Sequence, residues 1–192
     1  MNLAIDILQG LGLAQAAGIR PFLPALVAGA AARANVLVDF SGTSFAFMES
    51  PWWLLAMAAL ALVSLILRNE LVARPPLAAA LQGIGMGIGA LLFCATLAGD
   101  GYTWWPGIPV GLAAAWVAGA AVRDLFGRAS ARLDDEARSH LPVYAEGVAI
   151  MLAALSIVAP PVSLLALVFF IWLLVGGRRR RDQKYEGLRS LR

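Results

Sequence analysis

The strings ARPPL at residues 73–77 and VAPPV at residues 158–162 each stand at the start of a long apolar run. Proline is favoured in the first turn of a helix, because the N–H group that it lacks would have no helical partner there. Two further pairs of strings recur in the same order in both halves: PWW at 51–53 with PVY at 142–144, and AGIR at 17–20 with AAVR at 120–123. The three pairs predict a three-helix unit that occurs twice along the chain.

The composition is that of a protein embedded in lipid. Hydrophobic residues make up 60% of the chain and charged residues 14%, and the mean hydropathy is +0.77. A soluble domain carries about 25% charged residues, and a helix needs about 20 apolar residues to cross a bilayer. We therefore expect an all-α integral membrane protein with six transmembrane helices, over residues 2–19, 51–67, 75–98, 106–126, 141–158 and 161–175.

These six helices divide into two units. Residues 1–98 form the first three-helix repeat, and residues 99–176 form the second, which contains a charged amphipathic connector over 127–140. Residues 177–192 form a basic tail. Because each unit has an odd number of spans, the second should lie inverted relative to the first, as in many transporters.

The segment PFLPALVAGAAARA over residues 21–34 is too apolar for an exposed loop and too short to span a bilayer. The residue before a proline disfavours the helical conformation, so Arg20–Pro21 should break the helix. We expect a re-entrant helical segment on the outer side and an N-terminus inside. In the alternative, residues 3–34 form two short spans and the N-terminus lies outside.

The basic residues indicate the orientation of the chain. With residues 177–192 in the cytoplasm, Arg20 and Arg33 are the only arginines on the outer side of the predicted topology. This asymmetry follows the positive-inside rule and predicts a multi-pass protein of a bacterial inner membrane with a cytoplasmic C-terminus. Four consecutive arginines directly follow the last span and are expected to contact anionic lipid head groups: Arg178, Arg179, Arg180 and Arg181.

Arg20 and Pro21 form a first candidate binding site. At a helix break, free backbone N–H groups, the positive helix end and a guanidinium would converge, and such groups hold anions. In the alternative, the Arg20 side chain extends to the outer interface or pairs with Asp39 or Glu49.

A second candidate group is predicted on the inner half of the bundle and consists of Gln9, Gln82, Arg123 and Glu146, with Asp6 close to Gln9. A buried carboxylate such as Glu146 can carry a proton or bind a cation. The alternative is a structural ion pair between Arg123 and Glu146, since loss of one partner would leave an uncompensated charge.

Glycine occupies every second position in part of the third span, at Gly83, Gly85, Gly87 and Gly89. These residues form two overlapping GxxxG patterns, which let helices pack closely. We interpret them as internal packing, with a homodimer seam or a smooth pore-facing surface as the alternative. A nucleotide-binding role is excluded because no strand precedes them.

The chain offers little for catalysis. Its one cysteine, Cys94, and one histidine, His140, cannot make a zinc site of the usual kind. The sequence contains no plausible triad, phosphate loop or paired catalytic carboxylates. We expect no enzymatic activity, no metal and no cofactor.

Several strings resemble an uncharacterised bacterial multi-pass membrane protein family, a domain of unknown function. They are Gly18-Ile19-Arg20, the LVAGAAAR string at 26–33, the early Glu146 of a late helix, and the basic tail over 178–192. The string RNELVARP at 68–75 departs from the acidic turn of that family. The resemblance implies a fold and no established activity.

The leading functional hypothesis is a small transporter or channel for an ion or small polar solute, with its path between the two repeats. One alternative is a non-transporting membrane scaffold or accessory subunit, and another is a protein that binds or moves lipid. Expected partners are membrane lipids and, through the glycines, a second copy of the chain; nucleic acid is not expected.

Overall fold

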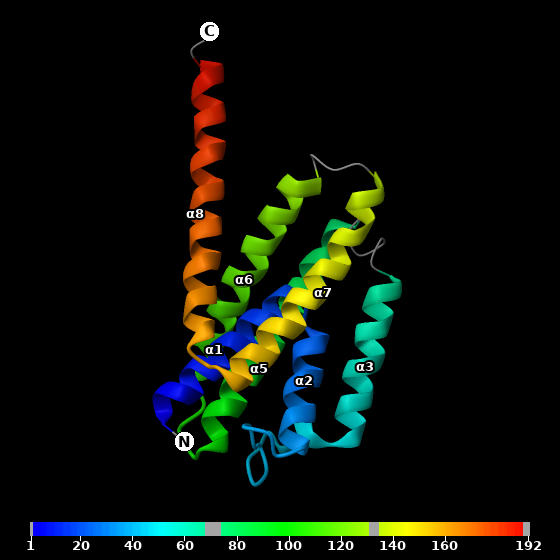
Figure 1. The fold of residues 1–192 in the computed structure, drawn as a ribbon, viewed down its shortest axis with the longest axis vertical. Helices are drawn as coiled ribbons and strands as arrows, with labels where there is room; N and C mark the ends of the chain where they lie inside the picture. Colours follow the sequence, from blue (N-terminus) through cyan, green and yellow to red (C-terminus); the bar gives the residue numbers. More distant parts are fainter. Residues whose placement is uncertain (1, 68–73, 131–134, 190–192) are drawn as a thin grey trace.

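The computed structural model describes the backbone of residues 2–67, 74–130 and 135–189, and the side chains of residues 2–67, 74–129 and 143–177. These residues form seven α-helices, a short 3₁₀ helix and no strand (Figure 1). The helices are α1 (Leu3–Ile19), α2 (Phe22–Arg33), η1 (Ala46–Glu49), α3 (Pro51–Ile66), α5 (Pro75–Gly99), α6 (Gly107–Ser130), α7 (Asp135–Val158) and α8 (Val162–Arg189). The all-α prediction is confirmed for the part of the chain that is described.

Helix α1 lies at the centre of the bundle. Its residues from Gln9 to Gly18 are all buried, and it packs against α5, α6, α7 and α8. A Cβ atom added to Gly18 would lie 2.6 Å from the Cα of Ala115 on α6. Small residues let helix backbones approach closely, so the glycines and alanines of α1 explain how four helices can surround it.

The chain breaks between α1 and α2. Arg20 adopts an extended conformation, with φ −144° and ψ 116°, as expected of a residue before proline. Helix α2 then returns toward the end of the molecule at which α1 begins (Figure 1). There the carbonyl of Leu37 accepts a hydrogen bond from Gln9 of α1.

The start of α1 and the loop after α2 therefore share one end of the molecule. The prediction that the N-terminus and this loop lie on opposite sides is wrong, and the arrangement follows the alternative of two short helices. The physical reason is that α2 reverses the chain direction, which also reverses the side on which α1 must begin.

The helix directions do not confirm a six-span inverted repeat. Gly10 of α1 and Gly107 of α6 both face Phe93 near the end of α5, and Gly85 in the first half of α5 faces Ala17 at the end of α1. Helices α1 and α6 thus both run antiparallel to α5. The sequence pairs these two helices as equivalent, yet they run in the same direction, whereas inversion requires opposite directions.

The helix bounds agree with the prediction at Pro51 and Pro75 but not at Pro142, because α7 begins at Asp135 rather than at Leu141 and includes this proline. Helices α3 and α5 begin at Pro51 and Pro75, as predicted. The end of α6 and the start of α7 cover most of residues 127–140, which were predicted to form a separate connector. Residues 131–134 of this range lie outside the described backbone. Helix α8 continues to Arg189 through most of the predicted tail.

Two helices, Pro75–Gly99 and Gly107–Ala129, are long and apolar enough to cross a membrane, and five shorter helices are also apolar. Large apolar side chains face outward, among them Trp52, Leu165 and Trp172, which are 82%, 71% and 66% exposed. Soluble monomers rarely expose contiguous apolar patches of more than a few hundred Å². The surface is therefore consistent with association with a membrane.

Candidate functional site

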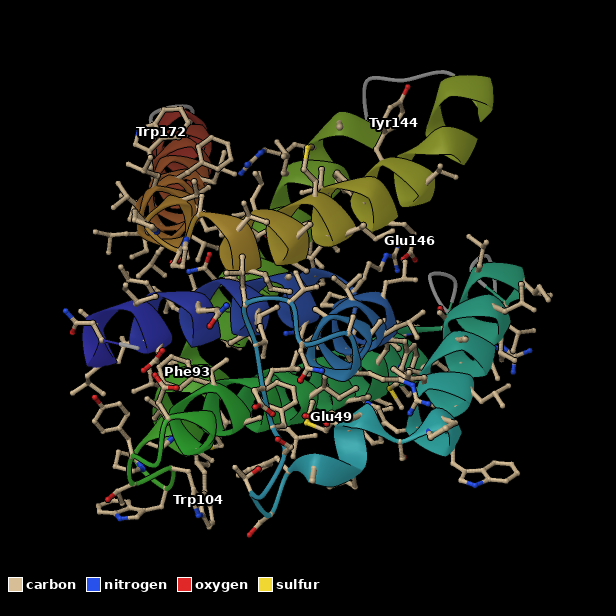
Figure 2. The ribbon with its side chains drawn as sticks, turned by 60° about the horizontal axis from the view of Figure 1, so that its bottom comes forward. Glu49, Phe93, Trp104, Tyr144, Glu146 and Trp172 are labelled. Carbon is tan, nitrogen blue, oxygen red and sulfur yellow. The ribbon has the colours of Figure 1, made fainter. Side chains whose placement is uncertain are left out.

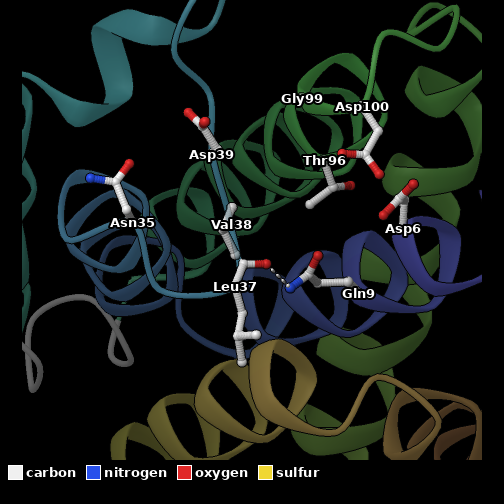
Figure 3. A pocket seen from close by; sticks show the side chains of 9 residues that line it. All are labelled: Asp6, Gln9, Asn35, Leu37, Val38, Asp39, Thr96, Gly99 and Asp100. Carbon is white, nitrogen blue, oxygen red and sulfur yellow. Dashed lines mark hydrogen bonds between the residues drawn. The ribbon is translucent and has the colours of Figure 1, made fainter. Parts of the chain in front are cut away.

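A pocket of about 240 Å³ lies where the start of α1, the end of α5 and the loop after α2 meet (Figure 3). We call its nine lining residues the acidic pocket: Asp6, Gln9, Asn35, Leu37, Val38, Asp39, Thr96, Gly99 and Asp100. None of the nine is basic. Its chemistry is therefore that of oxygen atoms and negative charge.

Two carboxyl groups face each other in this pocket. Asp6 lies in the first turn of α1 and Asp100 caps the end of α5, so antiparallel packing of the two helices brings them together (Figure 3). Asp6 is only 2% exposed, and its Oδ2 atom has no hydrogen-bond partner among the described residues. A buried charge is costly unless it is paired or coordinated, and the Asp100 side chain is a hydrogen-bond partner that Asp6 has within the pocket.

Two neutral side chains turn acceptor oxygens toward the same space. The Gln9 Nε2 group donates to the carbonyl oxygens of Leu37 at 3.2 Å and Ile157 at 3.4 Å. These two acceptors fix the orientation of the amide, which leaves its carbonyl oxygen on the side of Thr96 (Figure 3). The Thr96 hydroxyl donates to the Phe93 carbonyl at 2.8 Å and keeps acceptor lone pairs for the pocket.

The loop after α2 forms a fixed wall of the pocket. Leu37 has a φ of +58°, which is uncommon for a residue with a large side chain and accompanies the bond from Gln9 to its carbonyl. Arg33 donates to the Glu49 carbonyl at 3.1 Å, and the Phe40 N–H donates to the Glu49 carboxylate at 2.6 Å. These bonds tie the two ends of the loop together.

Asp39 stands at the exposed rim of the pocket. The N–H and hydroxyl groups of Ser41 donate to its carboxylate at 2.8 Å and 2.5 Å. These hydrogen bonds stabilise the charged form and hold the pKa of Asp39 below its usual value. Asp39 therefore adds negative charge at the mouth, with its carboxylate held by Ser41.

A second polar group, the ion-pair cluster, lies at the other end of α1 and consists of Arg20, Gln82, Arg123 and Glu146. The Arg20 Nε atom lies 3.2 Å from the Glu146 Oε1 atom, and the two side chains are 19% and 16% exposed. Arg123 donates a hydrogen bond to the Gln82 side-chain carbonyl. Figure 2 shows Glu146 on α7, facing the end of α1.

Two predictions about this cluster are wrong. Arg20 was expected on the outer side, at the interface or beside Asp39 or Glu49, and the structural alternative for Glu146 was a pair with Arg123. The structure pairs Arg20 with Glu146 instead. The break at Pro21 ends α1 beside the part of α7 that carries Glu146, so Arg20 is the cation that pairs with it.

Gln9 was also predicted to belong to this cluster and does not. It lies in the acidic pocket, together with Asp6. Arg20 follows Gln9 by eleven positions along the chain, which is about 16 Å at 1.5 Å per residue. The sequence prediction did not single out Asp100 and Thr96 as site residues. The signal for Asp100 was available, since α5 places an ionisable residue at its end, where an antiparallel α1 begins.

Between the two groups, α1 carries another buried polar side chain, Gln15. Its Nε2 group donates to the Ser163 carbonyl at 3.2 Å, and its Oε1 atom has no partner among the described residues. Polar side chains thus occur at successive levels of α1, from Asp6 through Gln9 and Gln15 to Arg20. At the last level the space beside Arg20 and Glu146 is too small for a water molecule.

The structure separates the two GxxxG patterns. A Cβ atom on Gly85 would lie 2.8 Å from the Ala17 carbonyl oxygen, and one on Gly89 would lie 3.1 Å from that of Ala14. No atom lies within 4 Å of a Cβ placed on Gly83 or Gly87. The 85/89 face is therefore internal packing against α1. The 83/87 face is open, and a homodimer seam there stays a prediction.

The described residues contain no group of three or more His, Cys, Asp or Glu that could hold a metal ion. The side chains of His140 and of the four arginines from Arg178 to Arg181 lie outside the described side chains. The lipid contact expected of these arginines therefore stays a prediction.

Comparison with known protein families identifies the family to which the chain belongs. A family profile described as "Domain of unknown function (DUF4126)" matches residues 7–180. The chain belongs to this family. Both the acidic pocket and the ion-pair cluster fall within the matched region except for Asp6, which lies one residue before it. Comparison with curated proteins and with solved structures gave no match.

Proposed function

We propose that this DUF4126 protein is a multi-pass protein of a bacterial inner membrane that moves an ion or a small polar solute along α1. The observation that carries the proposal is the pair of polar groups at the two ends of a buried helix that carries one further buried polar side chain, Gln15, between them. Ionisable residues within membrane segments are costly, and they commonly mark ion or substrate pathways.

The distribution of charge supports one orientation. Asp39, Glu49 and Asp100 lie at the end of the acidic pocket, whereas Arg74 and Arg128 lie at the end toward which α8 extends (Figure 1). Because α1 begins at the acidic end, Arg20 also belongs to the basic half, and among the arginines whose side chains are described only Arg33 departs from the asymmetry. By the positive-inside rule the basic end and the C-terminus are cytoplasmic.

The proposed path is open at the acidic pocket and closed at the ion-pair cluster. A solute that enters beside Asp6 meets Gln15 next, and then the Arg20–Glu146 pair, beside which no water fits. Passage therefore requires this pair to separate. We propose that the pair is the inner gate, opened by movement of α7 relative to the break at Pro21.

The topology is tested with single cysteines in a Cys94→Ala background. Asn2→Cys and Ser41→Cys should react with a membrane-impermeant maleimide in intact cells, because both residues lie at the acidic end. Arg128→Cys should react only after the membrane is permeabilised. Labelling of Asn2→Cys and Ser41→Cys from opposite sides would contradict the proposed arrangement of α1 and α2.

Transport is tested with purified protein in liposomes, using gradients of alkali-metal chlorides, small anions and small neutral polar solutes. We expect one class to cross faster than in protein-free liposomes. Glu146→Gln should change the rate by about tenfold or more, which corresponds to about 1.4 kcal/mol at the barrier. The matched control is Asp124→Asn on α6, which also replaces a carboxylate with an amide but lies beside Gly177 of α8.

The two possible failures have different meanings. If correctly folded wild-type protein moves nothing in the panel, the protein is not a transporter for these classes and the proposed function is wrong. If transport occurs but Glu146→Gln and Asp124→Asn both behave like the wild type, the path does not pass the ion-pair cluster.

A further inference from the structure

We propose that Gln9 is a positioning residue for the inner gate, because it holds the C-terminal end of α7, the helix that carries Glu146. This role rests on the proposed function, in which separation of Arg20 from Glu146 opens the path. How firmly the closed gate is held can nevertheless be measured without transport.

The carbonyl group of Ile157, near the end of α7, lacks the donor that a helix normally supplies. Such a carbonyl accepts a hydrogen bond from the N–H group four residues later, but residue 161 is a proline and has none. Ile157 is buried, and a buried carbonyl without a partner is costly. The Nε2 group of Gln9, which is also buried, donates to this carbonyl at 3.4 Å. A side chain of α1 thus replaces the missing donor of α7.

The same amide joins the end of α7 to the wall of the acidic pocket. The nitrogen of a glutamine side chain carries two hydrogen atoms, and Gln9 also donates to the Leu37 carbonyl at 3.2 Å (Figure 3). Leu37 belongs to the loop after α2, whose two ends are tied together by the hydrogen bonds to Glu49. Gln9 therefore anchors α7 to an element that lies outside α7.

Within the described side chains, polar contacts join α7 to α1 and its cap residue at two places. One is the bond from Gln9 to Ile157, and the other is the pair of Arg20 and Glu146 (Figure 2). Between these two contacts, the buried residues of α7 have apolar side chains that form no hydrogen bonds: Ala149, Leu152 and Ala153. Glu146 precedes Ile157 by eleven positions, or about 16 Å of helix. If the C-terminal end of α7 loses its anchor, the ion pair alone must hold the helix against α1.

The experiment measures how often water reaches the space beside the gate. Ser64 of α3 lines this space together with Arg20 and Glu146. Ser64→Cys is introduced into the full chain in a Cys94→Ala background, and its reaction with methyl methanethiosulfonate is followed in detergent. The thiolate is the reactive form, and it forms only where water is present. The parent should react slowly, and Glu146→Gln, which breaks the ion pair, should react fastest.

Gln9→Met keeps the length of the side chain but removes the donor. It should raise the labelling rate by about threefold or more, the effect on the closed state of losing one hydrogen bond. Gln9→Asn keeps the amide but is too short to reach both carbonyls, so it should raise the rate less; it also serves as the test if Gln9→Met does not fold. Size-exclusion profiles and circular dichroism identify any variant that fails to fold.

The matched control is Ser156→Ala, next to Ile157 on α7. It removes a buried hydroxyl group that donates to the Leu152 carbonyl at 2.6 Å, a hydrogen bond within α7 itself. The labelling rate should therefore stay at the parent value, even if the Tm falls.

Two results would overturn the role of Gln9. In the first, Glu146→Gln speeds labelling but neither Gln9 variant does; in the second, Ser156→Ala speeds it as much as Gln9→Met, which would indicate a general loosening of α7. If Glu146→Gln itself has no effect, the ion pair does not close this space, and both the gate and the role of Gln9 are wrong. Faster labelling in Gln9→Met without transport in liposomes would support the role of Gln9 and contradict only the proposed function.

Discussion

Gly18→Ala should severely destabilise the protein, although the substitution adds only one methyl group. The new Cβ would lie 2.6 Å from the Cα of Ala115 and closer still to its carbonyl oxygen. These are backbone atoms of α6, so no side-chain rotation can relieve the overlap and α1 must move away from α6. Overpacking of a core costs about 1–3 kcal/mol and occasionally more. We expect a loss of about 3 kcal/mol, or a fall in Tm of about 10 °C.

The matched control is Gly87→Ala on α5, where no atom lies within 4 Å of the added Cβ. Alanine is favoured over glycine in a helix interior by about 0.5–1 kcal/mol, so this variant should melt at or slightly above the wild-type temperature. Both are read by thermal unfolding in the same detergent. Equal behaviour of the two variants would show that α1 does not pack against α6 as described.

The sequence alone could not predict which glycines are packed against a neighbouring helix and which are open. The four glycines of α5 give two equivalent GxxxG patterns, and both faces of the helix are apolar, so nothing local distinguishes 83/87 from 85/89. Their difference arises only from the position of α1, which contacts Gly85 and Gly89. Helix existence was predictable, because Pro51 and Pro75 occupy the first turns of their helices and the apolar runs are long.

The side of the membrane on which α1 begins was harder to predict, because it depends on whether an odd or an even number of membrane crossings follows. Treating residues 21–34 as a re-entrant segment leaves α1 beginning inside, whereas treating them as a returning helix moves its start outside. A single short helix of 12 residues decides this. The error then carried into the sites, since it moved Asp6 and Gln9 to the wrong end and separated Arg20 from Glu146.

Some residues of each site could be predicted from the sequence. Ionisable and amide side chains are rare in these apolar runs, so Gln9, Arg20, Gln82, Arg123 and Glu146 were evident as candidates. Which of them meet depends on tertiary packing. The acidic pocket further requires a loop with a left-handed residue, Leu37, whose conformation no local pattern indicates.

Arg20→Ala should be the other strongly destabilising change, because it leaves the Glu146 carboxylate in a site where only 16% of its side chain is exposed. Removing one partner of a buried ion pair costs about 3–5 kcal/mol, since the remaining charge is uncompensated. With partial exposure we expect the lower limit of about 3 kcal/mol. Thermal unfolding measures the loss, and expression yield should fall with it.

The double variant Arg20→Met with Glu146→Leu separates this cause from a general need for Arg20. Replacing a buried ion pair by apolar residues of similar size is often neutral or stabilising, so the double variant should recover most of the Tm lost in Arg20→Ala. If the pair is also the inner gate, this well-folded double variant should still transport at an abnormal rate. An apolar contact then stands where the moving ion would otherwise meet the charged side chains of Arg20 and Glu146. Recovery of neither stability nor folding would mean that Arg20 makes an essential contact beyond Glu146.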